Sequence, residues 1–199
     1  APPGEAAEAE GETGIDLYAL THNETSTGVA MPIVRPTGTD AGALVAVDAT
    51  SAAGGLTFDA AQTDVYYFAP QKCLASDGGL WIAAVSPAAL ERIDRIASSD
   101  RWIPASIDLK IAKDNSLKDQ TYNTPALATI HLAVSQMEWI NTNGGLGMSS
   151  ARSAKSAEIM YSWAEASDYA TPFVSDPAIR SNVVATIDVD DSVDATTIS

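Results

Sequence analysis

Three short apolar runs constrain this chain more than any other feature of its sequence. They are IDLYAL at 15–20, ALVAVDA at 43–49 and DVYYFAP at 64–70. Each run is continuous rather than alternating, which is typical of strands covered on both faces in a parallel α/β sheet. A fourth run, GLWIAAV at 79–85, follows after a turn too short for a crossover helix. We therefore predict that this fourth strand pairs antiparallel with the third.

Helix signals follow the four strands. Ser86 and Pro87 predict a helix N-terminus, with the serine as the cap and the proline at the first helical position. Thr124 and Pro125 predict the start of a second helix in the same way, and Gly144 is expected to close it. Strands followed by helices around one sheet predict an α/β fold.

Three segments are expected along the chain. Residues 1–14 are interpreted as a flexible acidic lead-in, and 15–147 as part of a large three-layer α/β/α domain with a mostly parallel sheet. Residues 148–199 are interpreted as a connecting helix, about 148–166, and the beginning of a small α+β domain that contains a strand over 181–189. The chain starts without Met and stops just past an apolar run, so we expect it to be part of a longer protein.

The charge and cysteine content exclude several classes of function. The chain has 11 basic and 26 acidic residues and a net charge of −15, whereas nucleic acids and anionic membranes require basic patches. No run approaches the roughly 18 apolar residues of a membrane helix, and no His/Cys spacing suits a metal. The single cysteine, Cys73, can form no disulfide within the chain. A lone thiol favours a reducing compartment, and we predict a cytoplasmic protein.

Polar residues follow the ends of the first three predicted strands. Thr25 follows the first strand, Asp48 ends the second, and Gln71 and Lys72 follow the third. In open parallel sheets, ligands bind outside the carboxyl ends of the strands. If the three strands are neighbours, a hydroxyl, a carboxylate and an amine converge at one edge.

An amine and a carboxylate at one sheet edge suit pyridoxal phosphate. Lys72 could bond the aldehyde of this cofactor, and Asp48 could pair with its protonated ring nitrogen. The phosphate group favours backbone amides at a helix start, and Asn123 and Thr124 lie where a helix start is predicted.

Simpler interpretations of the same residues remain open. Lys72 could be a strand-end lysine that reaches water, and Asp48 could cap a turn. Asn123 and Thr124 could act only as helix caps. Cys73 is interpreted as a small packed residue, because no His–Asp arrangement supports a nucleophile.

Four stretches of the sequence resemble one enzyme family. They are THNETSTGVAMPIVRP, VDATSAAGG, YYFAPQKCLASDGGLW and SLKDQTYNTPALAT, and the resemblance runs from about residue 15 to the end. The family is that of the phosphoserine aminotransferases, pyridoxal-phosphate enzymes of fold type I and class V. The resemblance implies that Lys72 holds the cofactor and shuttles a proton, and that Asp48 pairs with the ring nitrogen. Thr25 would bond near the phenolic oxygen and Gln71 would contact the phosphate.

The resemblance also implies partners and a reaction. Asn123 and Thr124 would bind phosphate across a homodimer interface, in the partner's active site. The reaction would be reversible amino transfer between glutamate and 3-phosphohydroxypyruvate, in serine and pyridoxine biosynthesis. Family members are longer, and residues that bind phosphate, stack on the ring and grip the substrate would lie outside this chain. Two alternatives stay open: a catalytically incompetent structural or dimerising module, and a sibling enzyme such as an alanine–glyoxylate aminotransferase or a cysteine desulfurase.

Overall fold

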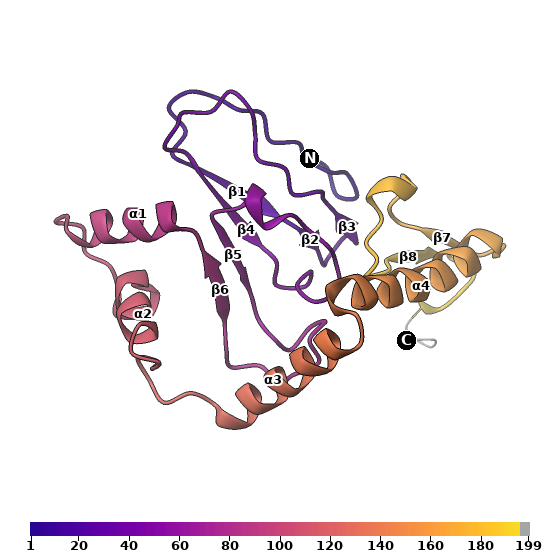
Figure 1. Cartoon of the computed structure of the whole chain (residues 1–199). Helices are drawn as coiled ribbons and strands as arrows, with labels where there is room; N and C mark the ends of the chain where they lie inside the picture. The colour runs from indigo at the N-terminus through magenta and orange to yellow at the C-terminus, as the bar shows by residue number, and fades with distance from the viewer. Residues whose placement is uncertain (196–199) are drawn as a thin grey trace.

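A four-stranded sheet lies at the centre of the structure (Figure 1). The structure is a computed structural model and describes residues 1–195. The strands are β1 (Leu17–Thr21), β2 (Asn23–Glu24), β3 (Val29–Ala30), β4 (Leu44–Asp48), β5 (Val65–Phe68), β6 (Ile82–Val85), β7 (Ala170–Pro172) and β8 (Ile187–Val189). The α-helices are α1 (Pro87–Ala97), α2 (Leu109–Ser116), α3 (Leu127–Thr142) and α4 (Gly145–Ala166), and the 3₁₀ turns are η1 (Ala60–Gln62), η2 (Ala105–Ile107) and η3 (Pro177–Ile179).

The sheet has the strand order β1-β4-β5-β6. β4 pairs in parallel with β1 on one side and with β5 on the other, and β6 pairs antiparallel with β5. The register aligns Thr21, Asp48 and Tyr67 across the three parallel strands. The prediction of three adjacent parallel strands and one antiparallel strand is therefore confirmed, as is the mixed α/β fold class.

The core packs around the central strand β4. Val45 and Val47 are 1% and 0% exposed, and the turn that follows them adds Ala52 and Leu56. β1 and β5 are covered less completely, since each has side chains that remain exposed. The expectation of coverage on both faces thus holds for β4 and is wrong for its two neighbours within this chain.

Asp64 joins the core to the first helix. Its carboxylate accepts hydrogen bonds from Arg35 Nη2 at 2.6 Å, from Val45 N at 2.8 Å and from Ser86 Oγ at 2.9 Å. Burial alone would raise the pKa of Asp64, but these bonds and the charge of Arg35 outweigh it and lower the pKa. Ser86 also accepts from Ala89 N at 3.2 Å, so it caps α1 as predicted.

The start of α3 differs from the prediction. The N-cap is Ala126, with no side-chain cap, and the first helical bond runs from Ile130 N to Ala126 O at 3.1 Å. Thr124 and Pro125 therefore precede the helix, and the predicted cap at Thr124 is wrong. Tertiary contacts at Thr129 fix the first turn, because its carbonyl accepts from Ser76 Oγ at 2.8 Å.

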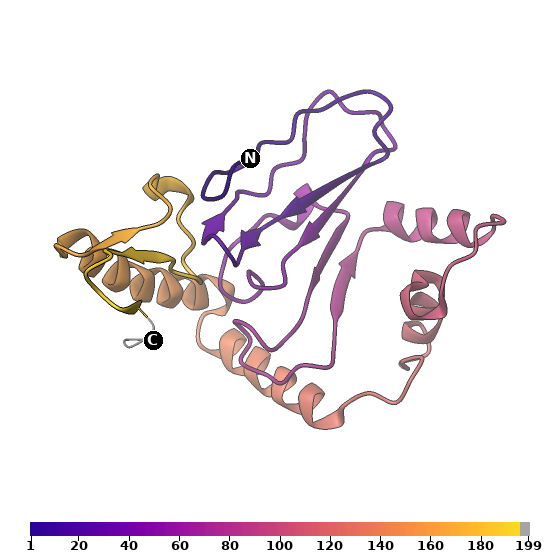
Figure 2. The same ribbon diagram turned by 180° about the vertical axis from the view of Figure 1, so that it is seen from behind.

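The helix predicted over 148–166 begins three residues earlier than expected, at Gly145. It starts directly after Gly144, whose left-handed backbone (φ +113°) separates α4 from α3. The strand predicted over 181–189 is correct only for β8, which pairs with the unpredicted β7. Figure 2 shows α4 with these two strands beside the main sheet. Residues 1–14 contain no helix or strand.

Residues 181–186 dock instead on the hairpin formed by β2 and β3. Ser181 N donates to Gly28 O at 2.8 Å, and Thr186 Oγ1 donates to Thr27 O at 2.7 Å. Tyr161 of α4 donates to Ser181 O at 3.0 Å. These polar contacts explain why this segment does not continue β8 as a strand.

Much apolar surface lies uncovered within this chain. The accessible surface is 12170 Å², against about 8,900 Å² for a compact monomer of this mass. Large exposed apolar side chains lie just before β6, in the loops on either side of α2, in η2 and at the start of α3: Trp81, Trp102, Ile107, Leu117, Tyr122 and Leu127. Within residues 1–195, no helix is both long and apolar enough to cross a bilayer.

We predict that Asp64→Asn lowers the free energy of unfolding by roughly 2–4 kcal/mol, because it leaves Arg35 without its anionic partner. Urea denaturation measures this change. The control is Glu158→Gln, which breaks an ion pair whose side chains are 69% and 63% exposed, and it should cost less than about 0.5 kcal/mol. Equal costs for the two variants would contradict the role given to Asp64.

Candidate active site

The carboxyl ends of β1, β4 and β5 lie at one edge of the sheet, as the parallel register requires. Asp48 is the last residue of β4, and Lys72 lies in the turn that follows β5. Thr25 lies in the turn between β2 and β3, in the hairpin that follows β1. The structure therefore brings these three predicted segments to the same edge, with Gln71 beside Lys72.

Asp48 is half-buried, and one of its carboxylate oxygens accepts a hydrogen bond from its own turn. Its Oδ1 accepts from Thr50 N at 2.9 Å, so the alternative of a turn cap is correct as far as this oxygen goes. Burial first, then the charge of the neighbouring Asp48 carboxylate and a side-chain hydrogen bond to it, raise the pKa of Tyr67. The backbone of Asp48 is also fixed, since His22 N donates to its carbonyl oxygen at 2.9 Å.

The turn that carries Lys72 is held at two points. Cys73 Sγ donates to Ser51 O at 3.2 Å, and Ser76 Oγ donates to Thr129 O at the start of α3. The Lys72 side chain is exposed, and in the described part of the chain it has no hydrogen bond or ion pair. An anchored turn with a free amine suits a lysine that bonds a ligand, and it equally suits the alternative of a lysine that reaches water.

Two glycines let this turn pack against the one that follows β4. A Cβ on Gly55 would lie 2.7 Å from Cys73 Sγ and 2.5 Å from Val183 Cγ1. Gly54 has a φ of +90°, and a Cβ there would lie 2.7 Å from Leu74 Cδ2. The turn 71–76 therefore sits in a cradle that larger residues would fill.

Thr25 is exposed, but its hydroxyl is anchored. Thr25 Oγ1 bonds Ser51 Oγ at 2.9 Å, and Asn23 Nδ2 donates to the same oxygen at 2.8 Å. Ser51 is 5% exposed. The sequence pattern did not point to Ser51, although it lies three residues after Asp48 in the stretch VDATSAAGG.

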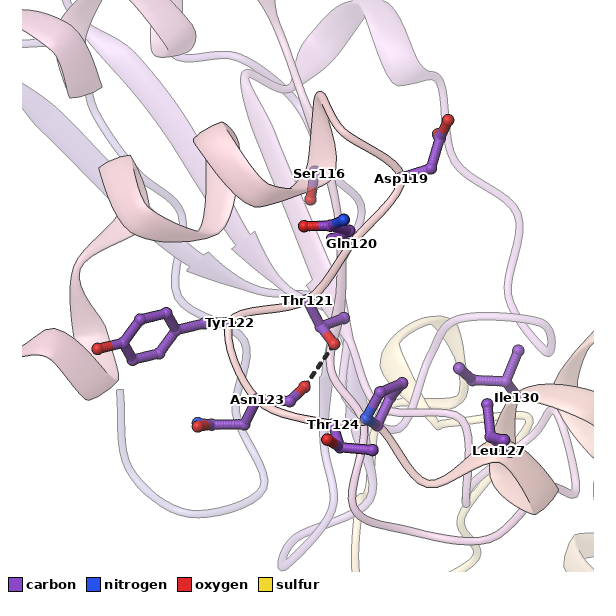
Figure 3. Close-up of a pocket in the computed structure, with 10 residues that line it drawn as sticks. Ser116, Asp119, Gln120, Thr121, Tyr122, Asn123, Thr124, Leu127 and Ile130 are labelled. Carbon is purple, nitrogen blue, oxygen red and sulfur yellow. Dashed lines mark hydrogen bonds between the residues drawn. The ribbon is translucent and has the colours of Figure 1, made fainter.

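Asn123 and Thr124 lie elsewhere in this chain. They line a cavity of about 690 Å³ formed by the loop between α2 and α3, where Thr121 Oγ1 donates to Asn123 O at 2.5 Å (Figure 3). Neither Asp48 nor Lys72 lines it. Both ribbon views place this loop beyond β6, away from the end of β4. The expected helix start at these residues is absent, so their amides are not those of a helix N-terminus.

A buried histidine, His22, packs next to the strands that carry the site. His22 is 3% exposed, its Nδ1 lies 3.1 Å from Tyr66 Oη, and Tyr66 stacks on Phe58 with centroids 3.8 Å apart. Burial lowers the pKa of His22 to about 4. No periodic signal in the sequence marks this cluster, because its members come from separate segments.

The donor set fits pyridoxal phosphate. A half-buried carboxylate, a free amine and an anchored hydroxyl share the edge of the sheet. These groups match a ring nitrogen, an aldehyde carbon and a phenolic oxygen, respectively.

Comparison with known proteins agrees with this chemistry. The family model for class-V aminotransferases matches residues 5–198. The chain belongs to the class-V aminotransferase family. It is 59% identical over 195 residues to the phosphoserine aminotransferase of Rhodococcus jostii, covering 98% of this chain and 52% of the relative. The chain thus spans about half the length of the curated relatives it matches.

Solved structures share the fold. The phosphoserine aminotransferase from Cytophaga hutchinsonii matches with a TM-score of 0.81 at 22% identity, over 90% of this chain and 51% of that one. A pyridoxal-phosphate-bound phosphoserine aminotransferase from Trichomonas vaginalis matches with a TM-score of 0.66 at 22% identity, over 82% and 42%. The predicted fold of a pyridoxal-phosphate transaminase is therefore confirmed.

We predict that Gly55→Ala displaces the turn that carries Lys72, because the new methyl group would overlap Cys73 Sγ and Val183. The variant should lose about 1–3 kcal/mol of stability, and Ellman's reagent should modify Cys73 faster. Gly42→Ala is the matched control, since nothing lies within 4 Å of its added carbon. Unchanged Cys73 reactivity in Gly55→Ala would refute the claim that the turn 71–76 packs closely against Gly55.

His22 makes stability depend on pH. Its pKa is about 4 in the fold and about 6.5 when unfolded, so the unfolded chain binds the proton more tightly. Stability should therefore be complete above about pH 6.5 and fall as the pH drops towards 4. Urea midpoints across this range should fall more steeply for the wild type than for His22→Gln. His131→Gln, a change at an exposed site on α3, should keep the wild-type slope.

Proposed function

We propose that this chain is part of a phosphoserine aminotransferase, which uses pyridoxal phosphate to transfer an amino group between glutamate and 3-phosphohydroxypyruvate. One observation carries the proposal: Asp48, Lys72 and Thr25 follow adjacent parallel strands to one sheet edge, in a chain that is 59% identical to an enzyme of that name. This identity favours the phosphoserine branch over the sibling aminotransferases and desulfurases.

Four residues of the chain would have separate roles in binding the cofactor and in the amino transfer. Lys72 Nζ would hold the cofactor and later carry a proton to and from the Cα of the substrate. Asp48 Oδ2 would accept the N–H of the ring and keep that nitrogen protonated. The bound cofactor supplies an electron sink that stabilises negative charge at the substrate Cα. Thr25 would bond the phenolic oxygen, and Gln71 would contact the phosphate.

A homodimer with shared active sites is part of the proposal. Asn123 and Thr124 would bind the phosphate in the partner's site. Asp48 and Lys72 do not line the cavity that Asn123 and Thr124 line within one chain, which supports this assignment. Tyr122 and Leu127 on either side are 59% and 72% exposed, and apolar groups of this size are often covered at an interface.

Location and pathway complete the proposal. We place the protein in the cytoplasm, because its single cysteine, Cys73, has no partner in the chain for a disulfide bond. The reaction would serve serine biosynthesis, and a role in pyridoxine biosynthesis stays a prediction. The alternative of a structural or dimerising module predicts a folded chain that does not bond the cofactor.

We predict that pyridoxal phosphate followed by borohydride labels Lys72, and that peptide mapping finds the adduct there. Lys72→Arg should lose the label. Asp48→Asn should retain the cofactor less tightly, because a neutral amide favours the ring N–H less than a carboxylate does. Lys155→Arg, at an exposed surface pair, is the control and should label like the wild type. A folded chain without label at Lys72 would favour the structural module.

A further inference from the structure

Ser51 ties together the segments that carry the proposed site. It is buried in the turn that follows β4. Its hydroxyl bonds Asn23 and Thr25 from the hairpin that follows β1. Its carbonyl oxygen accepts from Cys73, which is the neighbour of Lys72. Ser51, three residues after Asp48, thus contacts both the segment that follows β1 and the segment that follows β5.

The hydroxyl of Ser51 has more neighbours than it has protons to give. Asn23 Nδ2 lies 2.8 Å from Ser51 Oγ and can only donate, so it takes one lone pair. Asn23 O, at 3.2 Å, can only accept. Thr25 Oγ1, at 2.9 Å, can do either. The single proton of Ser51 therefore goes to the backbone oxygen or to Thr25.

These two arrangements give Thr25 different chemistry. When Ser51 donates to Asn23 O, Thr25 donates to Ser51 and presents only lone pairs to a ligand. When Ser51 donates to Thr25, the proton of Thr25 is free to point outward. The second arrangement keeps the shorter contact to Thr25 and gives up the longer contact to the carbonyl. Only hydroxyl rotations separate the two, and no proton leaves its oxygen.

We propose that Ser51 is a positioning residue that turns Thr25 into a hydrogen-bond donor. This inference rests on the proposed function, because the acceptor it serves is the phenolic oxygen of the cofactor. Ser51 touches neither cofactor nor substrate in this scheme. It acts by holding the Thr25 side chain in one rotamer and by either accepting a hydrogen bond from Thr25 or donating one to it.

The first test needs no cofactor. Three-bond NMR couplings report whether the Thr25 side chain occupies one rotamer. We expect one rotamer in the wild type and averaging in Ser51→Ala, whose methyl group cannot bond Oγ1. Ser86→Ala is the control, since it removes a hydroxyl at the opposite edge of the sheet. If Ser51→Ala does not fold, Ser51→Cys keeps the size of the side chain with a weaker bond. A single Thr25 rotamer in the folded variant would overturn the inference.

The second test uses the cofactor bound at Lys72. A donor to the phenolic oxygen disfavours a proton on the nitrogen next to it, so losing the donor raises the pH midpoint of the cofactor absorbance. Ser51→Ala and Thr25→Val should each raise this midpoint by about one pH unit, the scale of one hydrogen bond. The double variant should shift it no further, because both changes remove the same interaction.

The outcomes separate this inference from the proposed function. Additive shifts, or an unchanged midpoint in Ser51→Ala with Lys72 still labelled, would overturn the role of Ser51 and leave the aminotransferase proposal intact. An unlabelled Lys72 in the wild type would count against the proposed function. The coupling measurement would then decide by itself whether Ser51 positions Thr25.

Discussion

The parallel pairing of β4 with β1 and β5 is the constraint on which the rest of the structure depends. Parallel strands run their carboxyl ends to the same edge, so the turns that follow them meet there whatever their sequences. This geometry places Asp48 at that edge, because Asp48 is the last residue of β4. β4 has the most deeply buried side chains of the three strands, so its position is fixed by the core. The antiparallel strand β6 then carries the chain away towards α1 and α2, which lie on the β6 side of the sheet (Figure 1).

Pairing alone brings the turns near one another, and local polar contacts then fix their positions. Ser51, with its hydroxyl and carbonyl both in use, joins the Thr25 hairpin to the Lys72 turn. Gly54 and Gly55 allow the close approach that these bonds require. The segment after α4 adds a contact from outside, since Thr186 bonds the hairpin at Thr27. The hairpin that carries Thr25 is thus also held by the segment that follows α4.

Local patterns in the sequence correctly predicted the features that depend on neighbouring residues, namely the main strands and the start of the first helix. The apolar runs predicted β1, β4, β5 and β6, and Ser86 with Pro87 predicted α1. The strand-end rule then pointed to Asp48 and Lys72. What failed depends on distant contacts: α3 starts where Thr129 meets the Lys72 turn, and 181–186 docks on a hairpin instead of forming a strand. Ser51 was missed for the same reason, because a serine in a small-residue turn gains its role only from partners more than twenty residues away.

Lys72 and Asp48 must reach opposite sides of one cofactor ring if the proposed function is correct. The partner subunit is expected on the exposed apolar surface. The most direct measurement is a crystal structure of the chain after incubation with pyridoxal phosphate. We predict continuous density from Lys72 Nζ to the cofactor and an Asp48 oxygen within about 2.7–2.9 Å of the ring nitrogen. A cofactor bound elsewhere, or bonded to Lys72 with Asp48 turned away from the ring, would contradict it.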